Sequence, residues 1–279
     1  MPGICVVLFS GVFFPDTACA FDLRKIDPRQ AAERLNRFSI LDARPQKEWQ
    51  KAHLPGARSF SWENYTRTDS DGVKYRIFKP EELGNALGAL GISHTDAVLV
   101  YGDADSSWGG EGWLVWMLAW LGHQGAVYFL DGGIHLWRDS GQPVTSDIGN
   151  SHGQVTYQIH PRPEMNRTRD DIASQRGQIN LIDTRGYLTE YLPGHLPGAI
   201  HIPWGKFFKG PYRQSLAPHE LSALLEEKGV DLRKPVVYYC TGGIRSGFSW
   251  LVHSLGTLPP AVNFEGGTEE WARKHPLVR

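Results

Sequence analysis

The chain has 279 residues, of which 41% are apolar and 21% are charged, and its formal net charge at pH 7 is −1. This composition is typical of a soluble globular protein with room for two modest domains. The balanced charge and the lack of a cluster of basic residues argue against a nucleic-acid partner, and the three scattered cysteines show no metal-ligand spacing. We therefore expect neither a metal nor another cofactor.

Residues 1–20 have features of a secretory signal peptide. An apolar run covers residues 4–14, and residues 18–20 read Ala-Cys-Ala, which fits an A-x-A cleavage pattern. The run is too short to span a bilayer as a stable helix, so we expect no stable membrane insertion. No Lys or Arg precedes Arg24, and the alternative is a mis-assigned start codon in a cytoplasmic protein. We expect cleavage after Ala20, a periplasmic or secreted protein, and Cys240 as the only thiol of the mature chain.

The rest of the chain contains an internal repeat. Five motifs recur in the same order at a nearly constant offset, which chance does not readily produce. The paired segments are 40–44 with 181–185, 53–57 with 195–199, 98–101 with 236–239, 113–115 with 250–252, and 130–137 with 264–271. The sequence therefore predicts two copies of one domain.

Within each copy, short apolar runs alternate with helical patterns. The predicted strands are 39–42, 97–101, 126–130, 179–183, 235–239 and 261–264, and the predicted helices are 80–90, 110–121, 133–140, 218–228, 246–255 and 267–274. This alternation indicates an α/β fold in which each domain is a mainly parallel sheet with helices on both faces. The expected segments are a signal peptide at 1–20, a first domain at 21–146, a linker at 147–169 with one strand-like run at 155–159, and a second domain at 170–279.

The stretch at 235–250 is the strongest candidate for a catalytic centre. A predicted strand runs into Cys240, a short loop with two glycines follows, and Ser246 can cap the next helix. A strand, a tight loop and a helix start in this order aim backbone N–H groups and the positive end of the helix at one point. These groups and the charge of Arg245 favour a thiolate, which is the nucleophilic form of cysteine. A buried, unreactive cysteine is the alternative, but the glycines and the arginine favour the functional interpretation.

The repeat, its Asp-x-Arg strand ends, its His-Leu-Pro-Gly-Ala turns, its Gly-Gly-x-x-x-Trp helices and the single loop cysteine resemble a tandem-domain rhodanese of the thiosulfate/3-mercaptopyruvate sulfurtransferase family. The resemblance covers nearly all of the chain after residue 20. It implies an enzyme that takes a sulfane sulfur from a small anionic donor as a Cys240 persulfide. The persulfide then passes the sulfur to cyanide, to a thiol or to a protein thiol. The first copy has Gly102 in place of Cys240, with a following loop one residue longer judged from the tryptophans, and is expected only to support the pocket.

Several residues near Cys240 are candidates for substrate binding. The resemblance implies that the loop contacts substrate through Thr241, Gly242, Gly243, Ile244, Arg245 and Ser246. Arg185 either holds an anionic donor or forms an ion pair with Asp183 or Glu190, and the sequence leaves both roles open. Arg245 either contacts substrate or turns back to Asp183 and braces the loop, and we favour the bracing role.

Two residues of the first copy could face the cleft between the domains. His53 opens a turn that recurs with His195 in the other copy, which favours a structural role. The resemblance implies the alternative that His53 carries protons, because a mercaptopyruvate enzyme uses a histidine at that turn. Trp108 follows Gly102 in the first-copy loop and can line the cleft, although single tryptophans usually only pack.

The loop sequence leaves the donor and two other function classes open. It reads Cys-Thr-Gly-Gly-Ile-Arg, whereas tandem thiosulfate enzymes carry Cys-Arg-Lys-Gly and mercaptopyruvate enzymes carry Cys-Gly-Ser-Gly. A cysteine phosphatase or arsenate reductase also uses a cysteine, a backbone cradle and an arginine. Its loop places five residues between Cys and Arg, however, and this loop has four. A non-catalytic sulfur carrier would share every residue with the enzyme, and only turnover would separate the two.

Overall fold

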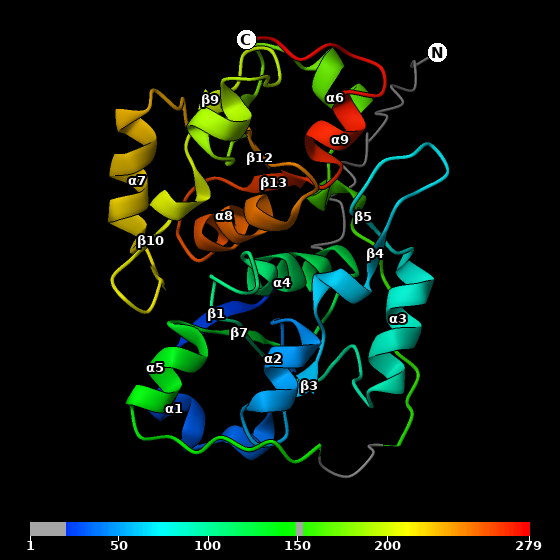
Figure 1. Cartoon of the computed structure of the whole chain (residues 1–279), viewed down its shortest axis with the longest axis vertical. Coiled ribbons are helices and arrows are strands. Elements are labelled where there is room, and N and C mark those ends of the chain that lie inside the picture. The colour runs from blue at the N-terminus through cyan, green and yellow to red at the C-terminus, as the bar shows by residue number, and fades with distance from the viewer. Residues whose placement is uncertain (1–20, 149–152) are drawn as a thin grey trace, which may run out of the picture.

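The structure is a computed structural model that describes residues 21–148 and 153–279, so the predicted signal peptide lies outside the described residues. Two α/β domains follow one another along the long axis of the molecule, with the first domain (blue to green) below the second (yellow to red) in Figure 1. Each domain is built on a parallel sheet with helices packed against it, which confirms the predicted fold class. In the described ranges, no helix has the length and apolar character needed to cross a bilayer.

The first domain contains a five-stranded sheet in the order β1–β7–β6–β2–β3, with all neighbouring strands parallel. Its central strands β6 and β7 are buried throughout, because helices cover both faces of such a sheet. The elements are β1 (Leu23–Ile26), α1 (Pro28–Ala32), β2 (Ser39–Asp42), α2 (Gln46–Lys51), β3 (Arg58–Ser59), β4 (Thr66–Arg67), β5 (Arg76–Ile77), α3 (Pro80–Ala89), β6 (Val98–Tyr101), α4 (Gly110–Trp120), β7 (Val127–Leu130) and α5 (Gly133–Asp139), with helical turns at Leu35–Arg37 and Trp62–Asn64.

The second domain repeats this plan with a four-stranded parallel sheet in the order β13–β12–β8–β9. Its predicted helix at 246–255 begins two residues earlier, and the one at 267–274 ends at Trp271. The elements are α6 (Arg169–Ser174), β8 (Asn180–Asp183), the π-helical turn η4 (Tyr187–Tyr191), β9 (Ile200–His201), β10 (Phe208–Lys209), β11 (Gln214–Ser215), α7 (Pro218–Glu227), β12 (Val236–Tyr239), α8 (Ile244–Ser254), β13 (Ala261–Phe264) and α9 (Gly267–Trp271), with turns at Pro163–Met165 and Trp204–Lys206.

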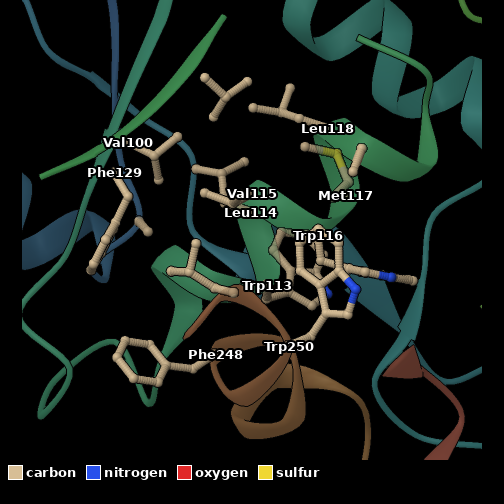
Figure 2. Close-up of a cluster of buried hydrophobic side chains, with 14 of the residues drawn as sticks. Val100, Trp113, Leu114, Val115, Trp116, Met117, Leu118, Phe129, Phe248 and Trp250 are labelled. Carbon is tan, nitrogen blue, oxygen red and sulfur yellow. The ribbon is translucent and has the colours of Figure 1, made fainter. Parts of the chain in front are cut away.

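The two domains meet where α4 packs against α8 in the middle of the molecule (Figure 1). The helix backbones approach closely at Gly247, where a Cβ atom would come within 2.8 Å of the Trp113 Cα atom. Figure 2 shows Trp113 and Trp116 of α4 beside Phe248 and Trp250 of α8. Because α4 is apolar nearly all round, it is buried between the first sheet and the second domain.

Each domain also extends an antiparallel hairpin onto the other. The β4–β5 hairpin of the first domain, cyan in Figure 1, reaches the second domain, where the Ile77 N–H donates to Glu265 Oε1 at 2.7 Å. The β10–β11 hairpin of the second domain reaches back, and the Ser215 N–H donates to Asp131 Oδ1 at 2.7 Å. Glu265 and Asp131 occupy equivalent positions in the repeat. The domains are therefore joined by two reciprocal hairpins as well as by the α4–α8 contact.

The segment predicted as a linker forms no strand at 155–159; its described residues 153–162 pack on the first domain, and Asn166 and Arg167 hydrogen-bond to the second. The Val155 N–H donates to the Gly88 carbonyl oxygen at 3.0 Å, and Tyr157 is buried near Gly84 of α3. The alternating apolar pattern that suggested a strand reflects packing against a helix, because the Tyr157 and Ile159 side chains both lie against Gly84 of α3.

Candidate active site

Cys240 lies where β12 ends and α8 begins. The strand-favouring run Val-Val-Tyr-Tyr ends at Tyr239, and α8 starts at Ile244. The preceding Gly243 has a φ of 83°, in the left-handed region that favours glycine, and this conformation makes the turn tight. A helix start of this kind directs unpaired backbone N–H groups toward the preceding loop. Cys240, only 1% exposed, therefore lies in the loop toward which these N–H groups point.

The prediction that Ser246 caps α8 is wrong. Gly243 occupies the cap position and Ser246 lies in the first turn of the helix, fully buried. Its hydroxyl oxygen is 3.6 Å from the Cys240 sulfur, a distance at which the O–H can donate a weak hydrogen bond to sulfur. The residue therefore contacts the reactive atom directly.

Arg245 braces the loop through Glu190 rather than through Asp183. Its Nη1 and Nη2 atoms each donate to one Glu190 carboxylate oxygen at 2.7 Å, and Nη2 also donates to the Thr241 hydroxyl oxygen at 3.0 Å. Burial opposes ionisation of Glu190, but hydrogen bonds from Arg245 and from the Gly186 N–H lower its pKa to about 2. We call this arrangement the Arg245–Glu190–Thr241 clamp; its two charges cancel at neutral pH.

Cys240 is reached from a pocket of about 480 Å³ that both domains line. The second domain supplies the reactive loop and the clamp, while the first domain supplies three aromatic side chains, here called the aromatic wall: Trp62, Tyr75 and Trp108. A Cβ atom on Gly242 would come within 2.8 Å of Tyr75 Cδ2, so the wall packs directly on the loop. The described lining residues are Trp62, Tyr75, Trp108, Glu190, Cys240, Thr241, Gly242, Ile244 and Arg245.

Arg185 does not line this pocket and instead forms an ion pair with Asp183. Its Nη2 donates to Asp183 Oδ2 at 2.6 Å and to the Gly194 carbonyl oxygen at 2.8 Å, and both charged groups are buried. Arg44 makes the same pair with Asp42, at 2.6 Å, in the domain that lacks the cysteine. Since the arrangement does not depend on a thiol, the geometry supports the ion-pair role of Arg185 and not donor binding.

His53 lies away from the pocket. Its Nδ1 is 2.7 Å from the Trp49 carbonyl oxygen, and its Nε2 is 3.1 Å from the Asp147 carbonyl oxygen. The ring is buried and stacks on Trp49. His53 therefore ties the start of the linker to the first domain, and the structure does not place it where it could carry protons to Cys240.

Two segments of the chain, residues 27–140 and 168–274, match the model of the rhodanese-like domain. The chain belongs to the rhodanese family. It is 32% identical over 243 residues to the sulfur carrier protein TtuD of Thermus thermophilus, covering 78% of this chain and 82% of that protein. It is 31% identical over 250 residues to the thiosulfate sulfurtransferase of Mus musculus, covering 83% and 81%.

The fold of this rhodanese is also that of solved structures of EanB. A structure of an EanB variant in complex with ergothioneine superposes with a TM-score of 0.79 and 22% sequence identity, covering 91% of this chain and 69% of that one. For wild-type EanB the chain spans 63% of the solved length. At these identities the likeness concerns the fold alone.

The first rhodanese domain fills its own version of the site with a carboxyl group. Glu111 is the second residue of α4, as Arg245 is of α8. A Cβ atom on Gly102 would overlap Glu111 Oε2 and would lie 3.1 Å from Ser107 Oγ, which donates to that oxygen at 2.6 Å. Complete burial raises the pKa of Glu111 to about 7. The carboxyl group thus occupies the space that a cysteine side chain would need.

The first-domain loop is also longer than the sequence suggested. Gly102–Trp108 separates β6 from the helix cap Gly109, whereas only Cys240–Gly242 separates β12 from the cap Gly243. The difference is four residues rather than one (seven against three), because the tryptophans used for the alignment lie on different turns of α4 and α8. The extra length carries Trp108 across to the second domain.

Three functional residues were not assigned to the site from sequence. Glu190 was considered only as a partner of Arg185, and Trp62 and Tyr75 were not singled out. A signal existed for Tyr75, since it precedes the β5 segment of a hairpin whose counterpart in the repeat ends at Ser215. Because the hairpins cross between domains, the residues that they bring to the pocket follow from tertiary structure and not from local pattern.

Proposed function

We propose that this rhodanese is a sulfurtransferase that moves a sulfane sulfur from a small anionic donor to a thiophilic acceptor through a persulfide on Cys240. The observation that carries the proposal is the placement of one buried thiol between a strand end, the start of α8 and the Ser246 hydroxyl, at a pocket open to small molecules. Family membership supports the same chemistry.

The reaction divides into two balanced steps. The Cys240 thiolate attacks the outer sulfur of the donor, a new S–S bond forms, and the bond between that sulfur and the rest of the donor breaks. With thiosulfate the departing electron pair leaves on sulfite. The acceptor then attacks the outer sulfur of the persulfide, and the electron pair of the S–S bond returns to Cys240. With cyanide the product is thiocyanate, and with a thiol it is a new persulfide.

The loop geometry supports this chemistry over a phosphatase or arsenate reductase. In a phosphatase or arsenate reductase, the arginine beside the cysteine would face a tetrahedral oxyanion. Here both Nη atoms of Arg245 donate to Glu190, so the guanidinium charge is already paired with a carboxylate and is not free to hold such a ligand. The persulfide step requires only that one extra sulfur with a single negative charge be held near backbone N–H groups and the Ser246 hydroxyl.

The test is to load the protein with a sulfur donor in the absence of acceptor. We expect a mass increase of one sulfur atom on the peptide that contains Cys240, and its removal by cyanide with release of thiocyanate. A screen of thiosulfate, mercaptopyruvate, polysulfide and glutathione persulfide identifies the donor. In Cys240→Ser both steps should fall to background while the circular dichroism spectrum stays native. Turnover by the serine variant, or phosphate on Cys240, would disprove the proposal.

The similarity to a sulfur carrier protein favours a second candidate function. In this case Cys240 would accept sulfur and hand it to the thiol of a partner protein without rapid turnover on small acceptors. The two functions share the loaded persulfide, so steady-state turnover with cyanide and with small thiols separates them. Loading without turnover indicates a carrier.

We also propose that the protein is exported. The apolar run at 4–14 and the Ala-Cys-Ala pattern at 18–20 support this, and cleavage there would leave Phe21 as the mature N-terminus. N-terminal sequencing of the native protein tests it, and an intact Met1 on functional cytoplasmic protein would overturn it.

A further inference from the structure

The pocket around Cys240 offers little free positive charge to a donor. Among the described residues that line it, Arg245 alone is a cation and Glu190 alone is an anion. Because Glu190 remains ionised at neutral pH and takes both Nη atoms of Arg245, their charges cancel within the clamp. A doubly charged donor such as thiosulfate would therefore lose its hydration on entry without meeting an unpaired side-chain cation in return.

The opposite side of the pocket is aromatic and accessible. Trp108 is 55% exposed and Tyr75 is 38% exposed, which are high values for such large apolar side chains. Both residues have positive φ, 54° for Trp108 and 61° for Tyr75, which is a strained conformation for bulky side chains. Trp62 is held behind them by a hydrogen bond from its Nε1 to the Ser107 carbonyl oxygen at 3.0 Å. With these backbone conformations the aromatic side chains line the pocket and are not buried in the core.

We infer that the preferred donor carries its sulfane sulfur, with one negative charge, on an apolar or aromatic organic group. This inference rests on the proposed sulfurtransferase function and specifies its substrate class. Such a donor places its organic group against the aromatic wall and its single charge toward the loop N–H groups. For a thiosulfonate, the Cys240 thiolate attacks the outer sulfur, the S–S bond of the donor breaks, and the electron pair leaves on a sulfinate. The total charge is the same before and after the step.

Glu190 is the specificity-determining residue in this scheme. It neutralises Arg245, and its own charge lies beside the reactive loop, where it disfavours a second negative charge on the donor. Trp108 is the complementary residue, because it supplies an exposed aromatic face without any charge. Changing each should alter the ranking of donors in a different way.

Three donors that each break an S–S bond separate the effect of donor charge from the effect of an aromatic group. Thiosulfate carries two charges, methanethiosulfonate carries one charge and a small apolar group, and benzenethiosulfonate carries one charge and an aromatic ring. Each kcat/KM, with cyanide as acceptor, is divided by the rate constant of that donor with free cysteine to remove intrinsic reactivity. We expect the order benzenethiosulfonate, methanethiosulfonate, thiosulfate for the unmodified protein.

Variants then test the two residues. Trp108→Ala should lower the corrected kcat/KM for benzenethiosulfonate by about three- to tenfold and leave that for the other two donors nearly unchanged. Trp108→Phe should retain most of the kcat/KM for benzenethiosulfonate. Glu190→Gln should raise the ratio of the corrected kcat/KM for thiosulfate to that for benzenethiosulfonate by about tenfold. The ratio of kcat/KM values between donors is used because a loosened loop would lower kcat/KM for all three donors by the same factor.

Glu82→Gln is the matched control. Glu82 accepts two hydrogen bonds from Arg67, each 2.8 Å long, on the exposed face of α3. This variant should leave the kcat/KM ratios between donors unchanged. The inference is overturned if thiosulfate ranks first, or if Trp108→Ala reduces all three donors by one factor. The inference is also overturned if mercaptopyruvate, polysulfide or glutathione persulfide loads sulfur on Cys240 while thiosulfate and the two thiosulfonates do not; if no donor of either set loads it, the proposed function itself fails.

Discussion

The two strand-to-helix loops of this protein share a backbone plan but hold different groups at the same point. In the second domain the point is occupied by the sulfur of Cys240, and in the first domain it is occupied by the carboxyl group of Glu111. Both helices start after a glycine with positive φ, Gly243 and Gly109. The comparison teaches that the strand, loop and helix start that frame this point belong to the fold, while the chemistry depends on the few side chains placed there.

Moving the thiol gives the largest expected effect. A variant with Cys240→Ser and Gly102→Cys keeps one loop cysteine but places it in the first domain. We expect no sulfur loading above background, because Glu111 and Ser107 fill the space beside residue 102. Overpacking should also lower the free energy of unfolding by ~1–3 kcal/mol. Mass spectrometry after donor treatment measures the loading, and a persulfide on the new cysteine would show that the cradle alone suffices.

The buried ion pairs sharpen the comparison because they are the same in both domains. Arg185→Ala leaves Asp183 buried without its partner, and we expect a loss of ~3–5 kcal/mol in the free energy of unfolding. Arg44→Ala is the matched control in the domain without a thiol, and it should cost a similar amount. Denaturant unfolding measures both, alongside kcat/KM. If only Arg185→Ala weakens donor use, Arg185 binds the donor after all.

Glu111 should make the stability of the protein depend on pH. Burial raises its folded-state pKa from 4.5 to about 7, so the folded state binds the proton more tightly than the unfolded state. The resulting loss of stability develops as pH rises from about 4.5 to 7 and is complete above that range. Glu111→Gln removes this charge, so the variant should gain at most ~3 kcal/mol over the unmodified protein at pH 8 and nothing at pH 4.5. Urea midpoints across this range provide the measurement; a gain that does not vary with pH would contradict it.

Removing the clamp should have the smallest effect of the four. Arg245→Ala leaves the Glu190 carboxylate unpaired beside the loop, and we expect kcat/KM to fall by about one to two decades for every donor, with the larger fall for doubly charged thiosulfate. The control is Arg67→Ala, which removes the same two-bond contact from exposed Glu82 and should change kcat/KM little. A loss confined to thiosulfate would mean that Arg245 contacts the donor.

The sequence predicted what local pattern and repetition determine. The α/β fold, most strand and helix positions and the Cys240 loop follow from apolar periodicity, glycines and the repeated motifs. The sequence did not predict that Arg245 pairs with Glu190 or that Ser246 lies within α8. Both depend on the exact residue at which a loop ends and the next helical turn begins. Of the aromatic wall, Trp108 was predicted to line the cleft and does so, but Trp62 and Tyr75 were not predicted, because they reach the pocket only across the interface between domains. The longer first-domain loop was misjudged because Trp113 and Trp250 share a motif but not a position on their helices.

The reciprocal hairpins have a consequence for how the chain unfolds. Glu265 is almost wholly buried, and its hydrogen-bond donors, Arg76 Nη1 at 2.6 Å and the Ile77 N–H, come from the other domain. Asp131 accepts the Ser215 N–H across the same boundary. If one domain unfolded alone, the other would be left with a carboxylate stripped of these donors and an uncovered face of α4 or α8. The reactive half and the silent half therefore form one cooperative unit, which gives the first domain a reason to persist without any chemistry of its own.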